Sequence, residues 1–142
     1  MLSSSRLLLS VAVFLFSSCL WAGEIILNVV NVRNDNGFLM AALHDSEASF
    51  PDEEGVLIYF MTKAHAGQTI VRFSVDEPGQ YAVSMFHDED NDGELIFSSY
   101  GSPLDGFAFS NNAIGVRSAP DFIDAAFDFY GGVVEQTIYL HY

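Results

Sequence analysis

The sequence of 142 residues carries 5 basic and 19 acidic residues, for a formal net charge of −14, and half of its residues are hydrophobic. A field of this sign repels nucleic acid and anionic lipid headgroups and favours cations or basic partners, or it serves only to keep an exported domain soluble. The one cysteine, Cys19, excludes a disulfide within the chain, so a folded domain must be stabilised by its core.

Residues 1–22 are typical of a secretory signal peptide, because a single positive charge at Arg6 is followed by an apolar run and a polar break. The run is shorter than the roughly 20 residues that cross a bilayer, and no later segment is a better candidate for a transmembrane span. We expect cleavage after Ala22, which leaves 23–142 as a single domain that is periplasmic or secreted. The alternative is processing at Cys19, which would give an outer-membrane lipoprotein.

Beyond the signal peptide, alternating hydrophobic residues and turn signals predict strands and no long helix. Asn36-Gly37 is a hairpin signal, and Glu77-Pro78-Gly79 is a second turn. The expected strands cover residues 25–30, 38–44, 56–62, 69–75, 81–86, 127–130 and 134–141.

Residues 97–118 are rich in Gly, Ser, Asn and Pro but also carry aromatic residues, which predicts a long ordered loop packed by those rings. Residues 120–126 are expected to form a helical turn. About seven short strands with frequent turns predict an all-β fold, an immunoglobulin-like or transthyretin-like β-sandwich. The similar steps His44-Asp45 and His87-Asp88 would reach one end of the sandwich if their strands were parallel neighbours.

An acidic loop after the strand over 81–86 carries the strongest chemical signal. Asp88, Asp90 and Asp92 occupy positions 1, 3 and 5 of a Ca²⁺-binding loop, Gly93 the sharp turn at position 6 and Glu94 the backbone-carbonyl position 7. With no nearby Lys or Arg, such carboxylates repel one another unless a cation is present. Hard oxygen ligands favour Ca²⁺ over Zn²⁺. We therefore predict a Ca²⁺ site at Asp88, Asp90, Asp92 and Glu94.

The match to a Ca²⁺ loop is incomplete. Position 12, where an EF-hand has a bidentate glutamate, is Ser99, so an ion would take its last ligands from elsewhere or from water. The alternative is an ordinary solvated turn in which Asn91, Asp92 and Gly93 tolerate positive φ. His87 either joins a transition-metal site or is a hydrogen-bonded structural residue.

Four further polar residues are candidates for ligand binding. Asn111 and Asn112 either offer their amides to a sugar or peptide beside Tyr100 or Phe107, or they bond the backbone of the long loop. Asp121 and Asp124 share a face if their segment is helical, and they either complete the metal site or cap the turn.

Several motifs in this chain follow one another in a recognisable order. They are the strand ending in His44-Asp45-Ser46, the turn before Tyr81, the acidic loop, and residues 106–113 and 120–127. Taken together, they resemble the bacterial exported family catalogued as domain of unknown function 2141. The resemblance covers nearly all of the chain beyond the signal peptide, and it implies a small exported β-sandwich. Where members of the family often carry another acidic residue, this chain has 96–99, Ile-Phe-Ser-Ser.

No established catalytic motif is present in the sequence. Ser110, His87 and an aspartate could be imagined as a triad, but the chain lacks a Gly-x-Ser-x-Gly elbow, a phosphate loop and a His-Glu-x-x-His helix. We expect an exported, non-catalytic binding or structural module of the cell envelope with a Ca²⁺-organised loop. Its partner would be an envelope glycan or protein, and not nucleic acid. The alternative is a metal-dependent hydrolase of the periplasm.

Overall fold

The computed structural model describes residues 23–142 except Glu53, so the expected signal peptide with Cys19 lies outside the described residues. The described residues form eight strands in two sheets, which confirms the predicted all-β sandwich. The immunoglobulin-like or transthyretin-like subtype stays a prediction. Within this part of the chain, no helix is long and apolar enough to cross a membrane.

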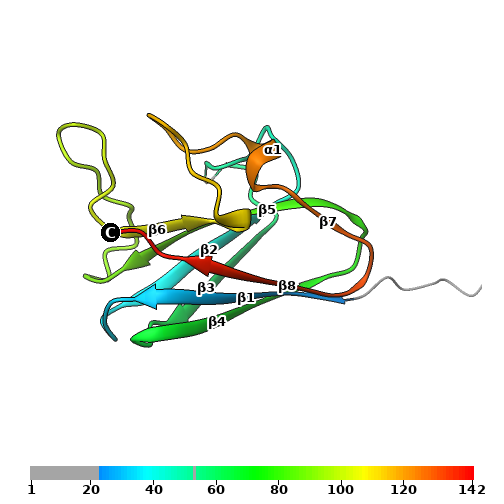
Figure 1. Cartoon of the computed structure of the whole chain (residues 1–142), viewed down its shortest axis with the longest axis horizontal. Coiled ribbons are helices and arrows are strands. Elements are labelled where there is room, and N and C mark those ends of the chain that lie inside the picture. Colours follow the sequence, from blue (N-terminus) through cyan, green and yellow to red (C-terminus); the bar gives the residue numbers. More distant parts are fainter. Residues whose placement is uncertain (1–22, 53) are drawn as a thin grey trace, which may run out of the picture.

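The smaller sheet contains three strands in the order β4 (Gly67–Val75), β1 (Gly23–Val32) and β8 (Gly132–Tyr139) (Figure 1). The central strand β1 runs antiparallel to β4 and parallel to β8. Near its end the register with β4 shifts by one residue at Asn31, which has a positive φ of 64°. The amide of Asn31 donates to the backbone oxygen of Leu140 at 2.6 Å, so the shifted residue fastens the chain that follows β8.

The larger sheet has the order β3 (Ile58–Lys63), β2 (Phe38–His44), β5 (Gly79–Asp88) and β6 (Gly106–Phe109), and all neighbours are antiparallel. The short strand β7 (Phe127–Phe129) pairs with the beginning of β5. Strand β5 is therefore the centre of this sheet, and the acidic loop leaves from its end.

The main core lies between the two sheets, because alternate side chains of each strand point inward. Burying one such aliphatic or aromatic side chain contributes about 1.5–3 kcal/mol. A smaller cluster covers part of the outer face of the larger sheet and contains Phe50, Ala82 and Ala125. The buried residues of the main core include Ile25, Leu27, Val29, Val71, Phe73, Val75, Tyr81, Val83, Met85 and Ile138.

Two features of the fold differ from the expectations. Strand β6 lies within 97–118, which the composition predicted as a loop throughout; it has four residues, begins with Gly106, and forms because β5 offers a free edge. The steps at His44 and His87 do not meet at one end of the sandwich. Because β2 and β5 are antiparallel, His44 pairs with Ala82 and His87 pairs with Leu39, and the two histidines lie at opposite ends of the strand pair.

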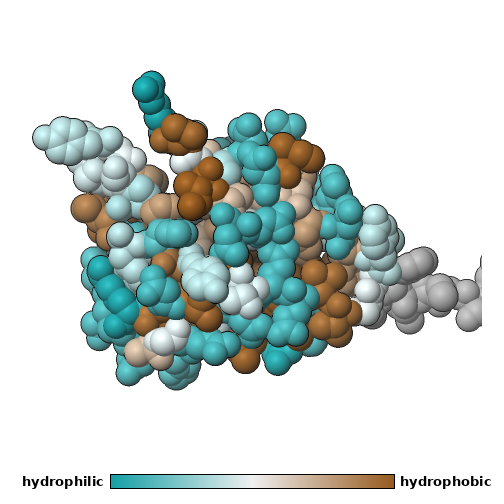
Figure 2. All heavy atoms as spheres, in the orientation of Figure 1, coloured by the Kyte–Doolittle hydropathy of each residue, from teal (hydrophilic) through white to brown (hydrophobic). Residues whose placement is uncertain are grey.

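The helical content matches the expected turn. Helix α1 (Phe122–Ala125) lies within 120–126, and a 3₁₀ turn, η1 (Ser110–Asn112), follows β6. Figure 1 shows the segment between β5 and β6 and the segment between η1 and α1 projecting from the same side of the sandwich. Each projecting segment carries exposed hydrophobic residues, and Figure 2 shows a hollow between them.

Candidate functional site

The acidic loop begins at Asp88, the last residue of β5, which pairs with Phe38 at the start of β2. A Cβ atom on Gly37 would lie 1.7 Å from the backbone oxygen of Asp88, so only glycine fits where the β1–β2 turn meets the loop. Asn91 and Gly93 have φ values of 63° and 77°, which both residues tolerate better than most. The Asn-Asp-Gly sequence therefore closes the loop.

The loop brings together the side chains of Asp88, Asp90 and Asp92. Each residue offers one carboxylate oxygen, and these three oxygens lie within 4.8 Å of one another. Two ligands on one Ca²⁺ ion, each about 2.3–2.6 Å from the metal, are separated by at most about 5.2 Å. Asp88 is 2% exposed whereas Asp90 and Asp92 are exposed. The cluster is therefore buried on the side of Asp88 and open to solvent on the side of Asp90 and Asp92.

Hydrogen bonds from backbone N–H groups to the aspartate carboxylates also stabilise this loop. The Asp88 carboxylate accepts from the N–H groups of Asp92 and Gly93 at 3.1 and 2.9 Å. One oxygen of Asp92 accepts from the N–H of Glu94 at 2.8 Å. The Glu94 carboxylate is not among the three converging groups, which fits its expected place as a backbone-carbonyl ligand.

The charges around the loop differ in one respect from the sequence-based picture. The expectation of no nearby Lys or Arg was wrong, because Arg33 forms an ion pair with Glu89. Asn34 donates to the other Glu89 oxygen at 2.7 Å. Burial alone would raise the pKa of Glu89, but the hydrogen bonds from Asn34 and Arg33 and the charge of Arg33 hold it below its usual value. Glu89 therefore acts as a charge partner of the β1–β2 turn.

Arg33 does not compensate the three aspartates in the same way. Among the described residues, no Lys or Arg forms an ion pair with Asp88, Asp90 or Asp92. Local desolvation, the charge of Asp92 and a hydrogen bond with Asp88 raise the pKa of Asp90, although its side chain is exposed. The carboxylates thus remain a concentrated negative site, which a cation would stabilise.

His87 is held away from the acidic cluster. Its ring is fully buried, Nε2 lies 2.8 Å from the backbone oxygen of Asn36, and Nδ1 lies 2.7 Å from the hydroxyl of Tyr142. A carbonyl only accepts, so Nε2 carries a proton and, in the neutral ring, Nδ1 accepts from Tyr142. Both nitrogens have protein partners, and this arrangement favours the structural interpretation of His87.

The side chains of Asn111 and Asn112 are exposed but bonded to neighbouring parts of the chain. The Asn111 amide donates to the backbone oxygens of Asp124 and Ala126 at 3.3 and 2.7 Å. The Asn112 amide donates to the Thr137 oxygen at 3.0 Å and accepts from the Tyr139 N–H at 2.9 Å, so it continues the hydrogen bonding of the β8 edge. These contacts support the alternative that both side chains hydrogen-bond to the protein backbone. The backbone atoms involved belong to α1 with its C-terminal end and to β8.

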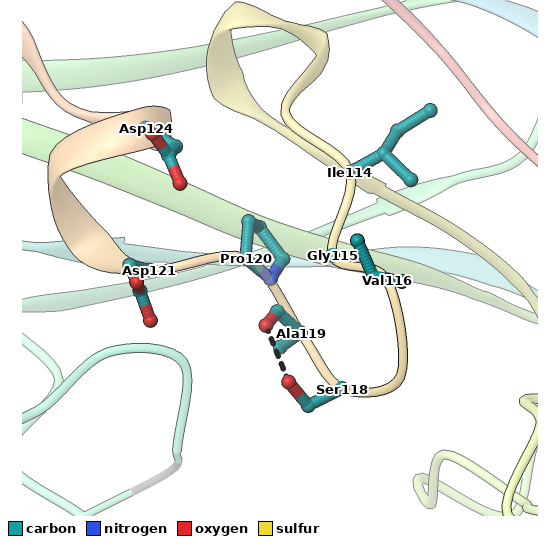
Figure 3. A pocket seen from close by; sticks show the side chains of 8 residues that line it. All are labelled: Ile114, Gly115, Val116, Ser118, Ala119, Pro120, Asp121 and Asp124. Carbon is teal, nitrogen blue, oxygen red and sulfur yellow. Dashed lines mark hydrogen bonds between the residues drawn. The ribbon is translucent and has the colours of Figure 1, made fainter.

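Asp121 and Asp124 lie apart from the acidic cluster. They line a small pocket of about 200 Å³ beside α1 (Figure 3), and the group of converging carboxylates does not include them. Asp121 precedes α1 but makes no side-chain capping hydrogen bond. The structure therefore gives these two aspartates neither of the roles considered from the sequence.

The imagined triad does not assemble around Ser110. Its buried hydroxyl donates to the backbone oxygen of Ala125 at 2.6 Å and accepts from the N–H of Val83 at 2.8 Å. His87 is engaged with Tyr142 and Asn36. Ser110 thus joins α1 to β5, which is a structural role.

The outer face of the larger sheet carries a groove of about 1100 Å³, here called the outer groove. Strands β2, β3, β5 and β6 contribute to its lining, and its walls are the projecting segments 93–103 and 114–119. Pro51 and Asp52 also line it. Tyr100 and Phe107 line it, as a stacking surface requires, but Asn111 and Asn112 are not among its lining residues. The sequence did not predict this groove, because its lining residues come from segments far apart in the chain.

The profile of the family described as "Uncharacterized protein conserved in bacteria (DUF2141)" matches residues 27–137, which include every strand except part of β1 and β8. No curated protein and no solved structure matches the chain.

Proposed function

The chain belongs to this DUF2141 family of uncharacterized bacterial proteins, and from that premise we propose that it is an exported, non-catalytic module of the cell envelope whose acidic loop binds Ca²⁺. The observation that carries the proposal is the convergence of three carboxylate oxygens, from Asp88, Asp90 and Asp92, within 4.8 Å.

The donor set suits a hard cation that accepts irregular coordination. Ca²⁺ takes about 6–8 oxygen ligands in flexible geometry, whereas Zn²⁺ sites are mostly four-coordinate with nitrogen or sulfur ligands. Asp88, Asp90 and Asp92 would hold the ion, the backbone oxygen of Glu94 would add a ligand, and water would complete the shell. Bound Ca²⁺ would supply positive charge that offsets the mutual repulsion of the carboxylates.

The position of the loop suggests what the ion does. Asp88 belongs to the central strand β5, while Gly93 and Glu94 begin the segment that forms one wall of the outer groove. An ion shared by the carboxylates would fix the beginning of this projecting segment against the sheet. We propose that Ca²⁺ organises the projecting loop and takes no part in a reaction.

Thermal unfolding in chelator and in 10 mM Ca²⁺, at constant ionic strength, tests the metal site. Without a glutamate at position 12 we expect a weak site, with a dissociation constant of about 10⁻⁴ to 10⁻³ M. Free ion at about 10 to 100 times this constant should stabilise the fold by about 1.4–2.7 kcal/mol and raise the melting temperature by several degrees.

Matched variants make this test specific. Asp90→Asn with Asp92→Asn should abolish the response to Ca²⁺, whereas Asp121→Asn with Asp124→Asn removes two carboxylates outside the cluster and should retain it. An unchanged melting curve of the native chain across this range of Ca²⁺ would leave the loop as an ordinary solvated turn.

Export and absence of catalysis have their own tests. Intact-mass measurement of native material should give a chain that begins at Gly23; a lipidated Cys19 would show the outer-membrane lipoprotein instead, and retained residues 1–22 would exclude export. A screen of glycoside, ester and phosphate substrates with divalent ions should be silent. Turnover that disappears with Asp90→Asn would support the alternative, a metal-dependent hydrolase.

A further inference from the structure

The outer groove is too large for a typical small-molecule pocket. Its volume of about 1100 Å³ exceeds the range of about 300–1,000 Å³ that holds drug-sized ligands. It is bounded by the outer face of the larger sheet and two projecting segments, and Figure 2 shows a hollow between these segments. A groove of this volume that is bounded in this way fits a segment of several residues better than a compact metabolite.

The lining of the outer groove is mainly apolar. Phe86, Phe107 and Met40 contribute to the floor, and Phe97 and Tyr100 stand on one wall with exposed fractions of 55% and 95%. Monomeric proteins rarely expose contiguous apolar surface of this kind unless it binds something. The surface therefore calls for an occupant with apolar side chains.

Polar groups suited to a sugar are scarce on the groove floor. The Ser84 hydroxyl, which lies there, is already bonded to His44 Nε2 at 2.9 Å. The amides of Asn111 and Asn112 are bonded to protein backbone. A glycan presents many hydroxyl groups and would leave them poorly paired on this floor, which costs binding energy. Apolar side chains of a peptide make no such demand.

The negative charge of the molecule indicates which kind of ligand with apolar groups the groove would bind. Asp52 and Glu94 line the groove and are exposed, and Arg117 is the one basic residue among the described lining residues. The whole chain has a formal net charge of −14. A field of this sign repels fatty acids and anionic lipids and attracts a basic partner.

We propose that the outer groove binds an extended segment of another protein in which apolar side chains alternate with basic ones. The apolar side chains lie on the floor and against Phe97 and Tyr100, and the basic side chains face Asp52 and Glu94. The proposal rests on the proposed role as a binding module and names its partner, and it does not require the Ca²⁺ ion.

Fluorescence anisotropy with a labelled eight-residue peptide of alternating leucine and lysine tests the proposal. We expect saturable binding of this peptide, little binding of a serine-lysine peptide of the same charge, and little binding of a leucine-glutamate peptide. Phe97→Ser with Tyr100→Ser should raise the dissociation constant at least about tenfold, because exposed aromatic residues often dominate such interfaces. Tyr130→Ser with Ile123→Ser, at positions 71% and 70% exposed and outside the groove, is the matched control and should change it by less than about twofold.

The proposal is overturned if the leucine-lysine peptide does not bind, if the serine-lysine peptide binds equally well, or if both double variants weaken binding equally. Saturable binding of cellohexaose that the Phe97→Ser, Tyr100→Ser variant abolishes, without peptide binding, would assign the groove to a sugar instead. Each titration is done in chelator and in 10 mM Ca²⁺. If the peptide binds in chelator and Ca²⁺ does not change the melting temperature, the proposed peptide site stands and the proposed metal site does not. If Ca²⁺ raises the melting temperature and the peptide does not bind, the metal site stands and the peptide site does not.

Discussion

Replacing Tyr142 by Phe should destabilise the base of the acidic loop. The substitution removes the hydroxyl that lies 2.7 Å from His87 Nδ1 and accepts from the Arg33 N–H at 3.1 Å. The phenyl ring still packs against Gly106 and still covers His87, which is fully buried, so water has little access to Nδ1. An unsatisfied buried polar atom costs about 1–3 kcal/mol. The Arg33 N–H is exposed to solvent and adds little.

Urea unfolding followed by far-ultraviolet circular dichroism measures this cost. We expect Tyr142→Phe to lower the free energy of unfolding by about 1–3 kcal/mol with an unchanged slope against urea concentration. Tyr130→Phe is the matched control, since Tyr130 is 71% exposed, and it should change the free energy by less than about 0.5 kcal/mol. Equal effects of the two substitutions would refute the assignment of His87 as a residue satisfied by Tyr142.

Three further predictions concern pH and the β8 edge. The pKa of Asp90 is raised in the folded protein, so folding favours its protonated form. Its contribution to stability is therefore present below the unfolded pKa of 3.8 and is lost as pH rises through the folded pKa. In chelator, Asp90→Asn should raise the melting temperature at pH 7 and should not raise it near pH 3.5. Burial lowers the pKa of His44, so its contribution to stability is present above the unfolded pKa of 6.5 and is lost as pH falls through the folded pKa. His44→Gln should therefore make the melting temperature fall less steeply below pH 6.5 than it does in the native chain. An equally steep fall in the variant would contradict this. Asn112→Ala leaves the Thr137 oxygen and the Tyr139 N–H without their partner and should cost about 0.5–1.5 kcal/mol in urea unfolding, whereas no loss would mean that water replaces the amide.

The strands that follow a clear period of two were predictable from the sequence. Thr69, Val71, Phe73 and Val75 alternate with Ile70, Arg72 and Ser74 and are buried on one face of β4, as expected. Strand β6 was not predictable in this way, because four residues beginning with Gly106 carry too little local signal and pair only where β5 offers its edge.

The candidate site shows the same division between local and long-range information. The Asp-x-Asp-x-Asp-Gly spacing is local. The alternative interpretation as a solvated turn placed Asn91, Asp92 and Gly93 at positions that tolerate positive φ, and the structure has positive φ at Asn91 and Gly93 but not at Asp92. The ion-pair partner of Glu89 is Arg33, which lies 56 positions earlier in the chain, so no local pattern could reveal this pair. The outer groove likewise depends on how β2, β5 and β6 align two distant projecting segments.

Equilibrium dialysis of the mature protein against ⁴⁵Ca²⁺ tests the central claim most directly. We predict one ion per chain with a dissociation constant of about 10⁻⁴ to 10⁻³ M. Binding should be lost in Asp90→Asn with Asp92→Asn and retained in Asp121→Asn with Asp124→Asn. Binding of less than one tenth of an equivalent at 10 mM Ca²⁺, or equal binding by the two double variants, would contradict a Ca²⁺ site at Asp88, Asp90 and Asp92.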